Sequence, residues 1–147
     1  MYTGKIYAIV RAPINEVYNF LFEIQRWVKY LPHCVDIKVE KQTSRAQIVT
    51  MQIKTNSKID TIRTVRNFHK NKQIEFRQTT LPSIFEFHGG TWVLTKFGTQ
   101  TMVTVVHNLK LKGNIFKRKL LQPIIWHFFI KRHSLTTLKM MRRYLEK

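Results

Sequence analysis

The apolar positions along this chain recur with two different periods. Residues 4–11 are rich in Ile, Val and Tyr, a composition typical of a strand, and Ala12-Pro13 ends that strand. From Pro13 to Leu31, apolar side chains recur every three or four residues, which is the period of a helix with one buried face. This segment predicts one helix, or two short helices if it breaks near Gln25.

After Cys34 the apolar positions recur with a period of two, the pattern of strands with one buried face. We expect hairpin turns at Asn56-Ser57 and Asn71-Lys72, although neither is the Asn-Gly pair that most strongly marks a hairpin. The expected strands lie at about residues 35–39, 48–53, 59–68, 74–76, 85–97 and 101–111.

The last element runs from about Asn114 to Leu145, where the apolar residues return to helical spacing. One long amphipathic helix fits this pattern. Pro123 lies inside it, and a proline removes one helical hydrogen bond and clashes with the preceding turn. We therefore expect the helix to kink at Pro123, or a first helical segment to end there.

The order of strand, short helices, about six strands and a long helix predicts an α+β fold. A twisted antiparallel sheet must cover its apolar face, and one long helix across it does so. A chain of 147 residues is the size of one domain, which we place at residues 1–147. Gly89 and Gly90 weaken a strand unless the sheet bends or something approaches its backbone. We expect either a bend or a ligand there, with Trp92 as a wall.

The chain carries 26 Lys and Arg against eight Asp and Glu, a formal charge of +18 that attracts anionic partners. Its single cysteine, Cys34, cannot form an intramolecular disulfide, and residues 1–20 lack the features of a signal peptide. We expect a cytoplasmic protein. The most apolar run, residues 123–130, is far shorter than the roughly 20 residues that span a bilayer.

Three stretches of the sequence together resemble one family. They are APINEVYNFLFEIQRWVKYLPHCVDIKVE, the run QTTLP followed by GGTW, and the final helix after VTVVHNLKLKG. They are similar to the START-like polyketide cyclase/dehydrase family, which includes aromatase/cyclases and coenzyme Q-binding START proteins. The resemblance implies a helix-grip fold: a curved antiparallel sheet of about seven strands around a long C-terminal helix, two short helices after the first strand, and a deep apolar cavity.

The resemblance also implies pocket residues. The two pocket tryptophans of the aromatase/cyclases match Trp27 and Trp92, and the arginine that holds the polyketide matches Arg66, the candidate catalytic residue. Arg63 points to the opposite face, and a register slip of one residue would exchange the two arginines. The proton-donating tyrosine of those cyclases matches Cys34, and a thiol is a poor substitute for a phenol, which argues against the cyclase reaction. The expected ligand-binding residues are Trp27, Leu31, Cys34, Ile62, Thr64, Arg66, His88, Trp92, His107 and Phe128.

The histidines show no metal-ligand spacing, and we expect neither a metal nor a cofactor. His88 and His107 lie on neighbouring predicted strands. There they either act as acid and base or form a structural hydrogen bond.

Eleven of the 26 basic residues lie between Lys110 and Lys147, against one acid, Glu146. They form either a solvated helix face or a surface that docks on an anionic membrane, where each basic residue contributes roughly 1 kcal/mol. Nucleic acid fits the charge, but no nucleic-acid-binding motif accompanies it. The candidate membrane-docking residues are Lys117, Arg118, Lys119, Lys131, Arg132, Arg142 and Arg143.

The leading hypothesis is a monomeric or dimeric protein that binds a hydrophobic small molecule between sheet and helix, such as a quinone, a polyprenyl lipid or an aromatic polyketide. The alternative is a cofactor-independent polyketide aromatase/cyclase or dehydrase. The third hypothesis is binding of a nucleic acid or an anionic surface through the basic C-terminal helix.

Overall fold

Within residues 1–146, the part of the chain that the structure describes, seven antiparallel strands form one sheet in the order β1-β7-β6-β5-β4-β3-β2. Lys147, the last residue of the expected domain, lies outside the described residues of this computed structural model. The strands are β1 (Tyr2–Val10), β2 (Cys34–Gln42), β3 (Ala46–Thr55), β4 (Lys58–His69), β5 (Gln73–Thr80), β6 (Phe85–Phe97) and β7 (Gln100–Leu111).

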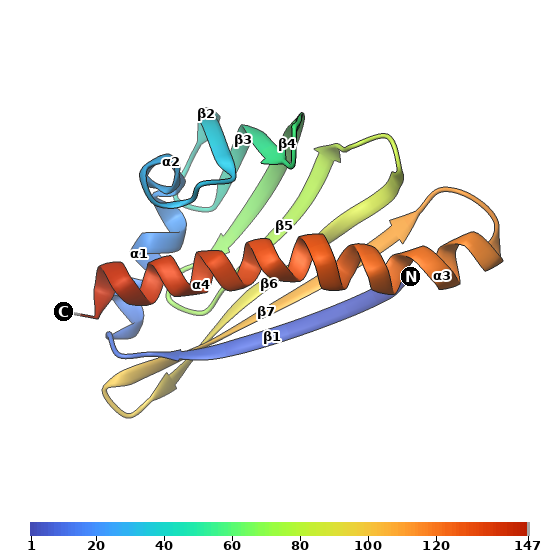
Figure 1. The fold of residues 1–147 in the computed structure, drawn as a ribbon. Helices are drawn as coiled ribbons and strands as arrows, with labels where there is room; N and C mark the ends of the chain where they lie inside the picture. The colour runs from blue at the N-terminus through green and yellow to red at the C-terminus, as the bar shows by residue number, and fades with distance from the viewer. Residues whose placement is uncertain (147) are drawn as a thin grey trace.

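The helical segments lie on one face of this sheet (Figure 1). They are α1 (Ile14–Phe22), a 3-10 turn (Ile24–Arg26), α2 (Trp27–Tyr30), α3 (Ile115–Ile125), a π-helical turn (Trp126–Ile130) and α4 (Lys131–Leu145). The α+β architecture predicted from the sequence, with about seven strands, two short helices after the first strand and a long C-terminal helix, is confirmed.

The predicted breaks in the chain occur where the backbone chemistry requires them. The first helical segment divides at the 3-10 turn that contains Gln25, so the version with two short helices is correct. Asn56 and Asn71 occupy the two predicted hairpin turns with φ angles of 57° and 59°. Asparagine is one of the few residues that adopts this left-handed conformation readily. The β3–β4 and β4–β5 connections are therefore short, and each pairs two consecutive strands in the sheet.

The helix does not end at Pro123. It continues to Ile125 and passes directly into the π-helical turn and α4. Trp126 donates its backbone N–H towards the carbonyls of Gln122 and Pro123, so the ladder of hydrogen bonds resumes just after the proline. Single π-helical turns of this kind are typical of functional regions of helices. The whole C-terminal segment consequently runs along the sheet as one long element (Figure 1).

The glycines of β6 make room for protein atoms. Gly90 pairs with Phe76 on one side and His107 on the other, and the rings of Phe76 and His107 meet at 5.3 Å between centroids. A Cβ on Gly90 would lie 1.9 Å from the carbonyl oxygen of Val106, and one on Gly89 would lie 2.9 Å from the carbonyl oxygen of Phe76. Neither glycine lines the main cavity, which corrects the expectation that a ligand approaches the backbone there.

A second glycine, Gly4 of β1, seats the C-terminal helix on the sheet. A Cβ at Gly4 would lie within 2.4 Å of three atoms of the Trp126 indole. That indole is only 5% exposed, and it lies 5.6 Å from the His107 ring. The bulky ring and the bare backbone therefore fit together where the π-helical turn crosses the sheet edge.

Candidate functional site

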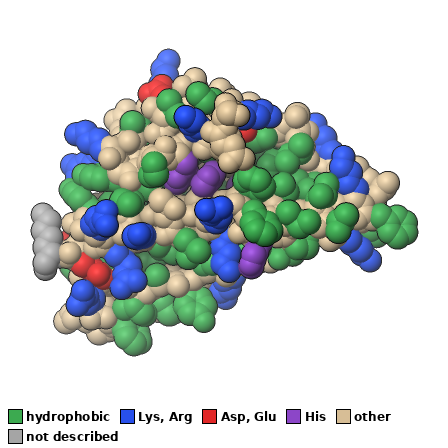
Figure 2. Space-filling view, in the orientation of Figure 1, with side chains coloured by type: hydrophobic (Ala, Val, Ile, Leu, Met, Phe, Trp, Pro, Cys, Tyr) green, Lys and Arg blue, Asp and Glu red, His purple; other side chains and the backbone are tan. Residues whose placement is uncertain are grey.

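A cavity of about 530 Å³ lies between the sheet and the C-terminal helical segment. Its sheet wall comes from inward-facing residues of β3 to β7, and its helix wall includes Ile125, Phe129, His133 and Thr137. In Figure 2, histidine side chains lie in a hollow in the middle of one face of the molecule. The size falls within the range of about 300–1,000 Å³ that is typical of small-molecule sites.

The structure brings seven of the ten residues expected to bind a ligand into the wall of this cavity. These seven are Trp27, Ile62, Thr64, Arg66, His88, Trp92 and His107. Trp27 and Trp92 contact each other edge to face at 6.2 Å, and the Trp27 indole N–H donates to the carbonyl of Phe20 at 3.0 Å. Their positions are therefore set by packing before any ligand arrives.

Three of the expected residues lie elsewhere. Leu31 and Cys34 are buried in the core outside the cavity wall, at 2% and 6% exposure. Phe128 is 56% exposed, and its neighbour Phe129 lines the cavity instead. The cavity face of the helix runs through Ile125 and Phe129, and one residue along a helix is a rotation of about 100°. Phe128 consequently points to solvent.

Arg66 is the most deeply buried charge in the wall, with 3% of its surface exposed. Its guanidinium donates to Gln47 Oε1 at 2.8 Å and to the carbonyl of Leu21 at 2.5 Å, and it lies against the rings of Trp27 and Phe68. Burial lowers the pKa of Arg66 to about 9, a fall that the nearby Tyr18 hydroxyl partly offsets. No ion pair with Asp or Glu involves Arg66 in residues 1–146.

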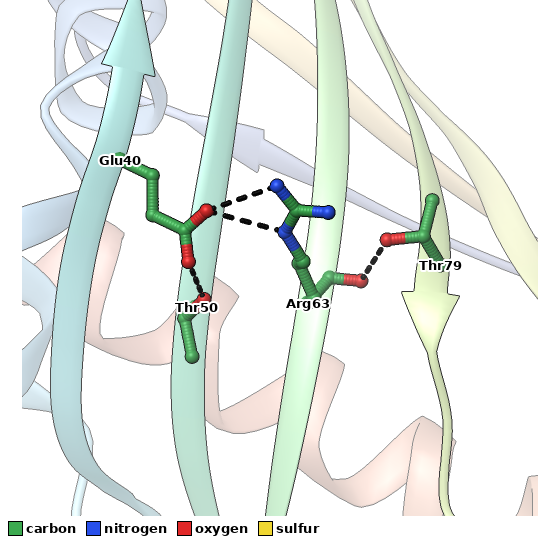
Figure 3. Close-up of polar contacts among 4 residues, drawn as sticks. All are labelled: Glu40, Thr50, Arg63 and Thr79. Atoms are coloured by element: carbon green, nitrogen blue, oxygen red, sulfur yellow. Dashed lines mark hydrogen bonds and ion pairs between the residues drawn. The ribbon is translucent and has the colours of Figure 1, made fainter.

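Arg63 faces away from the cavity. It forms an ion pair with Glu40 at 3.0 Å on the outer face of the sheet, and Glu40 also accepts a hydrogen bond from Thr50 (Figure 3). Hydrogen bonds from Thr50 and Arg63 lower the pKa of Glu40. The register that turns Arg66 inward, and not the slipped one, is therefore the register of β4.

Two polar side chains beside Arg66 have buried oxygens without partners. Thr64 and Gln78 are directly opposite on β4 and β5, and both line the cavity. Thr64 Oγ1 and Gln78 Oε1 make no hydrogen bond within the described residues. A buried oxygen of this kind costs free energy unless it meets a donor or acceptor, so a ligand that enters the cavity finds unsatisfied polar atoms next to the guanidinium.

Three further side chains form a hydrogen-bonded row across the cavity. His88 Nε2 and His107 Nδ1 lie 2.9 Å apart, and His107 Nε2 lies 2.7 Å from Ser134 Oγ on α4. Burial lowers the pKa of His88 to about 4, and burial together with His88 holds the pKa of His107 well below its usual range. Both rings are neutral at pH 7, so each has one nitrogen that donates and one that accepts.

A second pair of histidines links the α2–β2 connection to α4. The rings of His33 and His133 stack in parallel, with centroids 4.2 Å apart and planes 2° from each other. Both residues line the cavity. Burial first, and the neighbouring ring second, lower the pKa of His33 to about 4, and burial with nearby Arg132 also lowers the pKa of His133.

Sequence reasoning missed Gln78, Ser134 and the stacked histidines as parts of the site. Ser134 and Thr137 carried a usable signal, because they are polar residues on the helix face that also holds Ile130 and Met141. Polar residues on an otherwise apolar helix face suggest a buried hydrogen-bonded site. The stack of His33 on His133 carried no such signal, since the two residues are far apart in the sequence.

The structure also tests the metal-ligating and thiol groups of the chain. Among residues 1–146, no group of three or more His, Cys, Asp or Glu side chains is arranged to hold a metal ion. Burial raises the pKa of the Cys34 thiol to about 12, which keeps it protonated and unreactive. No helix in the same described range is both long and apolar enough to cross a membrane.

The seven-stranded sheet gripping a long helix, with a cavity between them, defines a helix-grip protein. The model of the family described as polyketide cyclase / dehydrase and lipid transport matches residues 10–129. The chain therefore belongs to this START-like family. It is 28% identical over 107 residues to the granaticin polyketide synthase bifunctional cyclase/dehydratase of Streptomyces virginiae, an alignment covering 70% of this chain and 34% of that protein.

Two solved structures show the same fold. The di-domain aromatase/cyclase BexL of the BE-7585A biosynthetic pathway superposes with a TM-score of 0.87 at 19% identity, over 99% of this chain and 50% of that one. The Zhui aromatase/cyclase of Streptomyces sp. R1128 superposes with a TM-score of 0.85 at 16% identity, over 99% of this chain and 93% of that one. This chain thus spans about a third of the cyclase/dehydratase and half of the di-domain protein.

Proposed function

We propose that this protein binds a hydrophobic small molecule in the cavity, and that Arg66 holds a carbonyl or anionic group of that molecule. Quinones, polyprenyl lipids and aromatic polyketides have this chemistry, and the family description names both polyketide cyclisation and lipid transport. The single observation that carries the proposal is a buried guanidinium in the wall of an apolar cavity, with no carboxylate partner among residues 1–146.

A buried charge is expensive unless it is paired and hydrogen-bonded. Arg66 has five N–H donors, and protein oxygens take two of them. Thr64 and Gln78 add unsatisfied oxygens beside it. A ligand oxygen placed here would satisfy the guanidinium, while Trp27 and Trp92 would bury apolar ligand surface at roughly 25 cal/mol per Å² before the ordering costs of association.

Two measurements test this proposal. Native mass spectrometry of the purified protein, followed by organic extraction, should show a bound lipid, quinone or polyketide. Titration with a short-chain ubiquinone should quench tryptophan fluorescence, since Trp27 and Trp92 line the cavity. An empty protein that takes up neither the ubiquinone nor an anthraquinone carboxylate would overturn the proposal.

Arg63 provides a matched control for the role of Arg66, because both arginines lie on β4 but on opposite faces. Arg66→Gln should weaken binding about 10- to 100-fold, the effect of one hydrogen bond to a charged group. Arg63→Gln should leave binding unchanged. Equal affinities of the two variants would remove Arg66 from the site.

The second candidate function is a cofactor-independent aromatase/cyclase or dehydrase. The neutral row His88–His107–Ser134, facing the same cavity as Arg66, favours it. There Arg66 would stabilise an enolate, and an imidazole would take the proton from carbon and return it to a departing hydroxyl, so that water leaves. If so, Arg66→Gln should lower the turnover rate of a linear polyketide by a larger factor than it lowers the affinity for that polyketide. Cys34, where the family resemblance places a tyrosine, remains an argument against this reaction.

We further propose a cytoplasmic protein, monomeric or homodimeric, that visits an anionic membrane surface. The basic C-terminal segment supports this, because each Lys or Arg near such a surface contributes roughly 1 kcal/mol. The residues proposed for this contact are Lys117, Arg118, Lys119, Lys131, Arg132, Arg142 and Arg143. Flotation of the protein with vesicles that contain phosphatidylglycerol, lost at high salt, would support the contact.

A further inference from the structure

Helix α3 and the π-helical turn after it carry an apolar stripe that nothing in the described structure covers. Phe116, Leu120, Ile124 and Phe128 recur every fourth residue, and they are 82%, 66%, 41% and 56% exposed. We call these four residues the α3 stripe. Figure 2 shows apolar side chains gathered over this end of the molecule, with Lys and Arg side chains among them. Contiguous exposed apolar surface on a helix marks an interaction site more often than chance.

The orientation of the stripe is set by the opposite face of the helix. Gln122 is buried and its Oε1 accepts a hydrogen bond from the backbone N–H of Leu111 at 3.1 Å. Trp126 lies over Gly4 of β1. These contacts hold one side of α3 against the end of the sheet, and the first turns of the helix extend beyond the strands (Figure 1). The stripe therefore faces outward.

The charges around the stripe are of one sign. Lys117 follows Phe116 and Lys119 precedes Leu120, so the two lysines emerge on opposite sides of the stripe, each about 100° away around the helix. Residues 115–145 contain eight Lys and Arg and no Asp or Glu. An apolar band with basic flanks is the pattern of a helix that lies in the interface of an anionic bilayer.

We propose that α3 docks in the surface of an anionic lipid bilayer, with the α3 stripe among the acyl chains and Lys117 and Lys119 on the headgroup phosphates. This deepens the proposed membrane contact and rests on it, but it does not depend on the identity of the cavity ligand. If a second copy of the chain covered the stripe, two helices whose charged residues are all basic would meet, and like-charge repulsion disfavours that contact. A nucleic acid would leave the apolar band uncovered.

Docking by this surface places the cavity wall at the membrane. Ile125 and Phe129, which line the cavity, directly follow two members of the stripe, Ile124 and Phe128. Ile84, on the β5–β6 connection, also lines the cavity and is 50% exposed. One helix thus carries the docking face and a wall of the cavity on adjacent faces. A hydrophobic ligand would pass between bilayer and cavity with little exposure to water.

The test is vesicle flotation of the full chain with phosphatidylcholine alone and with phosphatidylcholine mixed with phosphatidylglycerol. The wild type should float only with the anionic mixture. Phe116→Ser with Leu120→Ser should weaken this partitioning at least about tenfold, since each removes an apolar side chain from the interface. The control is Phe97→Ser in β6, because Phe97 is similarly exposed, at 59%, but lies outside the stripe. It should float like the wild type.

A second set of variants tests the charges by replacing one lysine at a time. Lys117→Ser and Lys119→Ser should each weaken partitioning about fivefold, and Lys96→Ser in β6 should leave it unchanged. Equal flotation with neutral and anionic vesicles, or full flotation of the Phe116→Ser, Leu120→Ser double variant, would overturn the proposal. So would light scattering that shows a dimer which this double variant dissociates, because a second copy would then cover the stripe.

The ubiquinone titration separates this proposal from the cavity function. The stripe variants should bind the ubiquinone from solution as the wild type does, and circular dichroism should confirm that they are folded. A protein that floats with anionic vesicles but takes up no ligand would refute the cavity proposal alone. A protein that binds the ligand but does not float would refute the docking alone.

Discussion

Replacing Arg66 with methionine should make this protein more stable while removing its ability to hold a polar ligand group. The guanidinium is 3% exposed and has no acidic partner among the described residues. Met has a similar length and packs well against aromatic rings, and Trp27 and Phe68 already surround this side chain. The exchange therefore removes a buried charge without leaving a large void.

The magnitude follows from the pKa of Arg66, which burial lowers by more than three units, to about 9. At about 1.4 kcal/mol per pKa unit, folding disfavours the charged form by about 5 kcal/mol. The substitution leaves two oxygens, Gln47 Oε1 and the Leu21 carbonyl, without the donor they now have, and each costs about 1–3 kcal/mol. With about 2 kcal/mol for each oxygen, we expect a net gain of about 1 kcal/mol.

Urea unfolding, followed by tryptophan fluorescence, measures this gain. The midpoint should rise without a change in the slope of the transition. The stability difference between the variant and the wild type also depends on pH. Because the folded pKa of Arg66 is depressed, the unfolded wild type binds more protons than the folded wild type between about pH 9 and 12. The wild type therefore gains stability relative to the variant as the pH rises through that window. A lower midpoint in the variant at pH 7 would refute the reasoning, since the hydrogen bonds of Arg66 would then outweigh its burial.

Three further predictions concern the packing and the polar groups around the cavity. Gly4→Ala should lower the free energy of unfolding by about 1–3 kcal/mol in urea, because its methyl would overlap the Trp126 ring. Thr64→Val should leave stability unchanged or raise it slightly while weakening ubiquinone binding, because the buried hydroxyl has no partner to lose. The urea midpoint should fall as pH drops from about 6.5 to 4, since folding depresses the pKa values of His33, His133, His88 and His107. His33→Gln with His133→Gln should make that fall smaller, while His88 and His107 keep their share of it.

One of these predictions has a matched control variant, and the other two have an outcome that would contradict them. Thr101→Val should lower stability by about 1 kcal/mol where Thr64→Val does not, because the Thr101 hydroxyl donates to the carbonyl of Ala12. Full stability of Gly4→Ala would mean that the Trp126 ring moves at no cost. A pH profile that is identical in the wild type and the double histidine variant would assign the acid sensitivity to other groups.

Most of the fold could be read from local patterns in the sequence. Strand β6 spans the predicted residues 85–97, and β7 begins one residue before the predicted start at 101. Asn56 and Asn71 marked their turns because few other residues adopt a left-handed backbone. Of the two outcomes predicted for Pro123, a helix end is excluded, because α3 continues to Ile125, while a kink stays a prediction.

The site was only partly predictable. The alternation of side chains along β4 allowed two registers, one with Arg66 facing the cavity and one with Arg63 facing it. The first is the observed register, because Arg66 pairs with Gln47 on one neighbouring strand and with Phe76 on the other. The family resemblance placed Trp27 and Trp92 in the cavity wall, where the structure has them. The same resemblance did not locate Phe129, because the helix rotation that exchanges it with Phe128 depends on how the helix is seated.

The sequence by itself determined the elements, their order and the excess of positive charge, because helical and strand periods, turns and charge are properties of residues close together in the chain. Only the tertiary structure decided that His88, His107 and Ser134 form one row, that His33 stacks on His133, and that α3 leaves its apolar stripe uncovered. These features join residues separated by tens of positions, so they depend on strand register and helix rotation, which long-range packing alone sets.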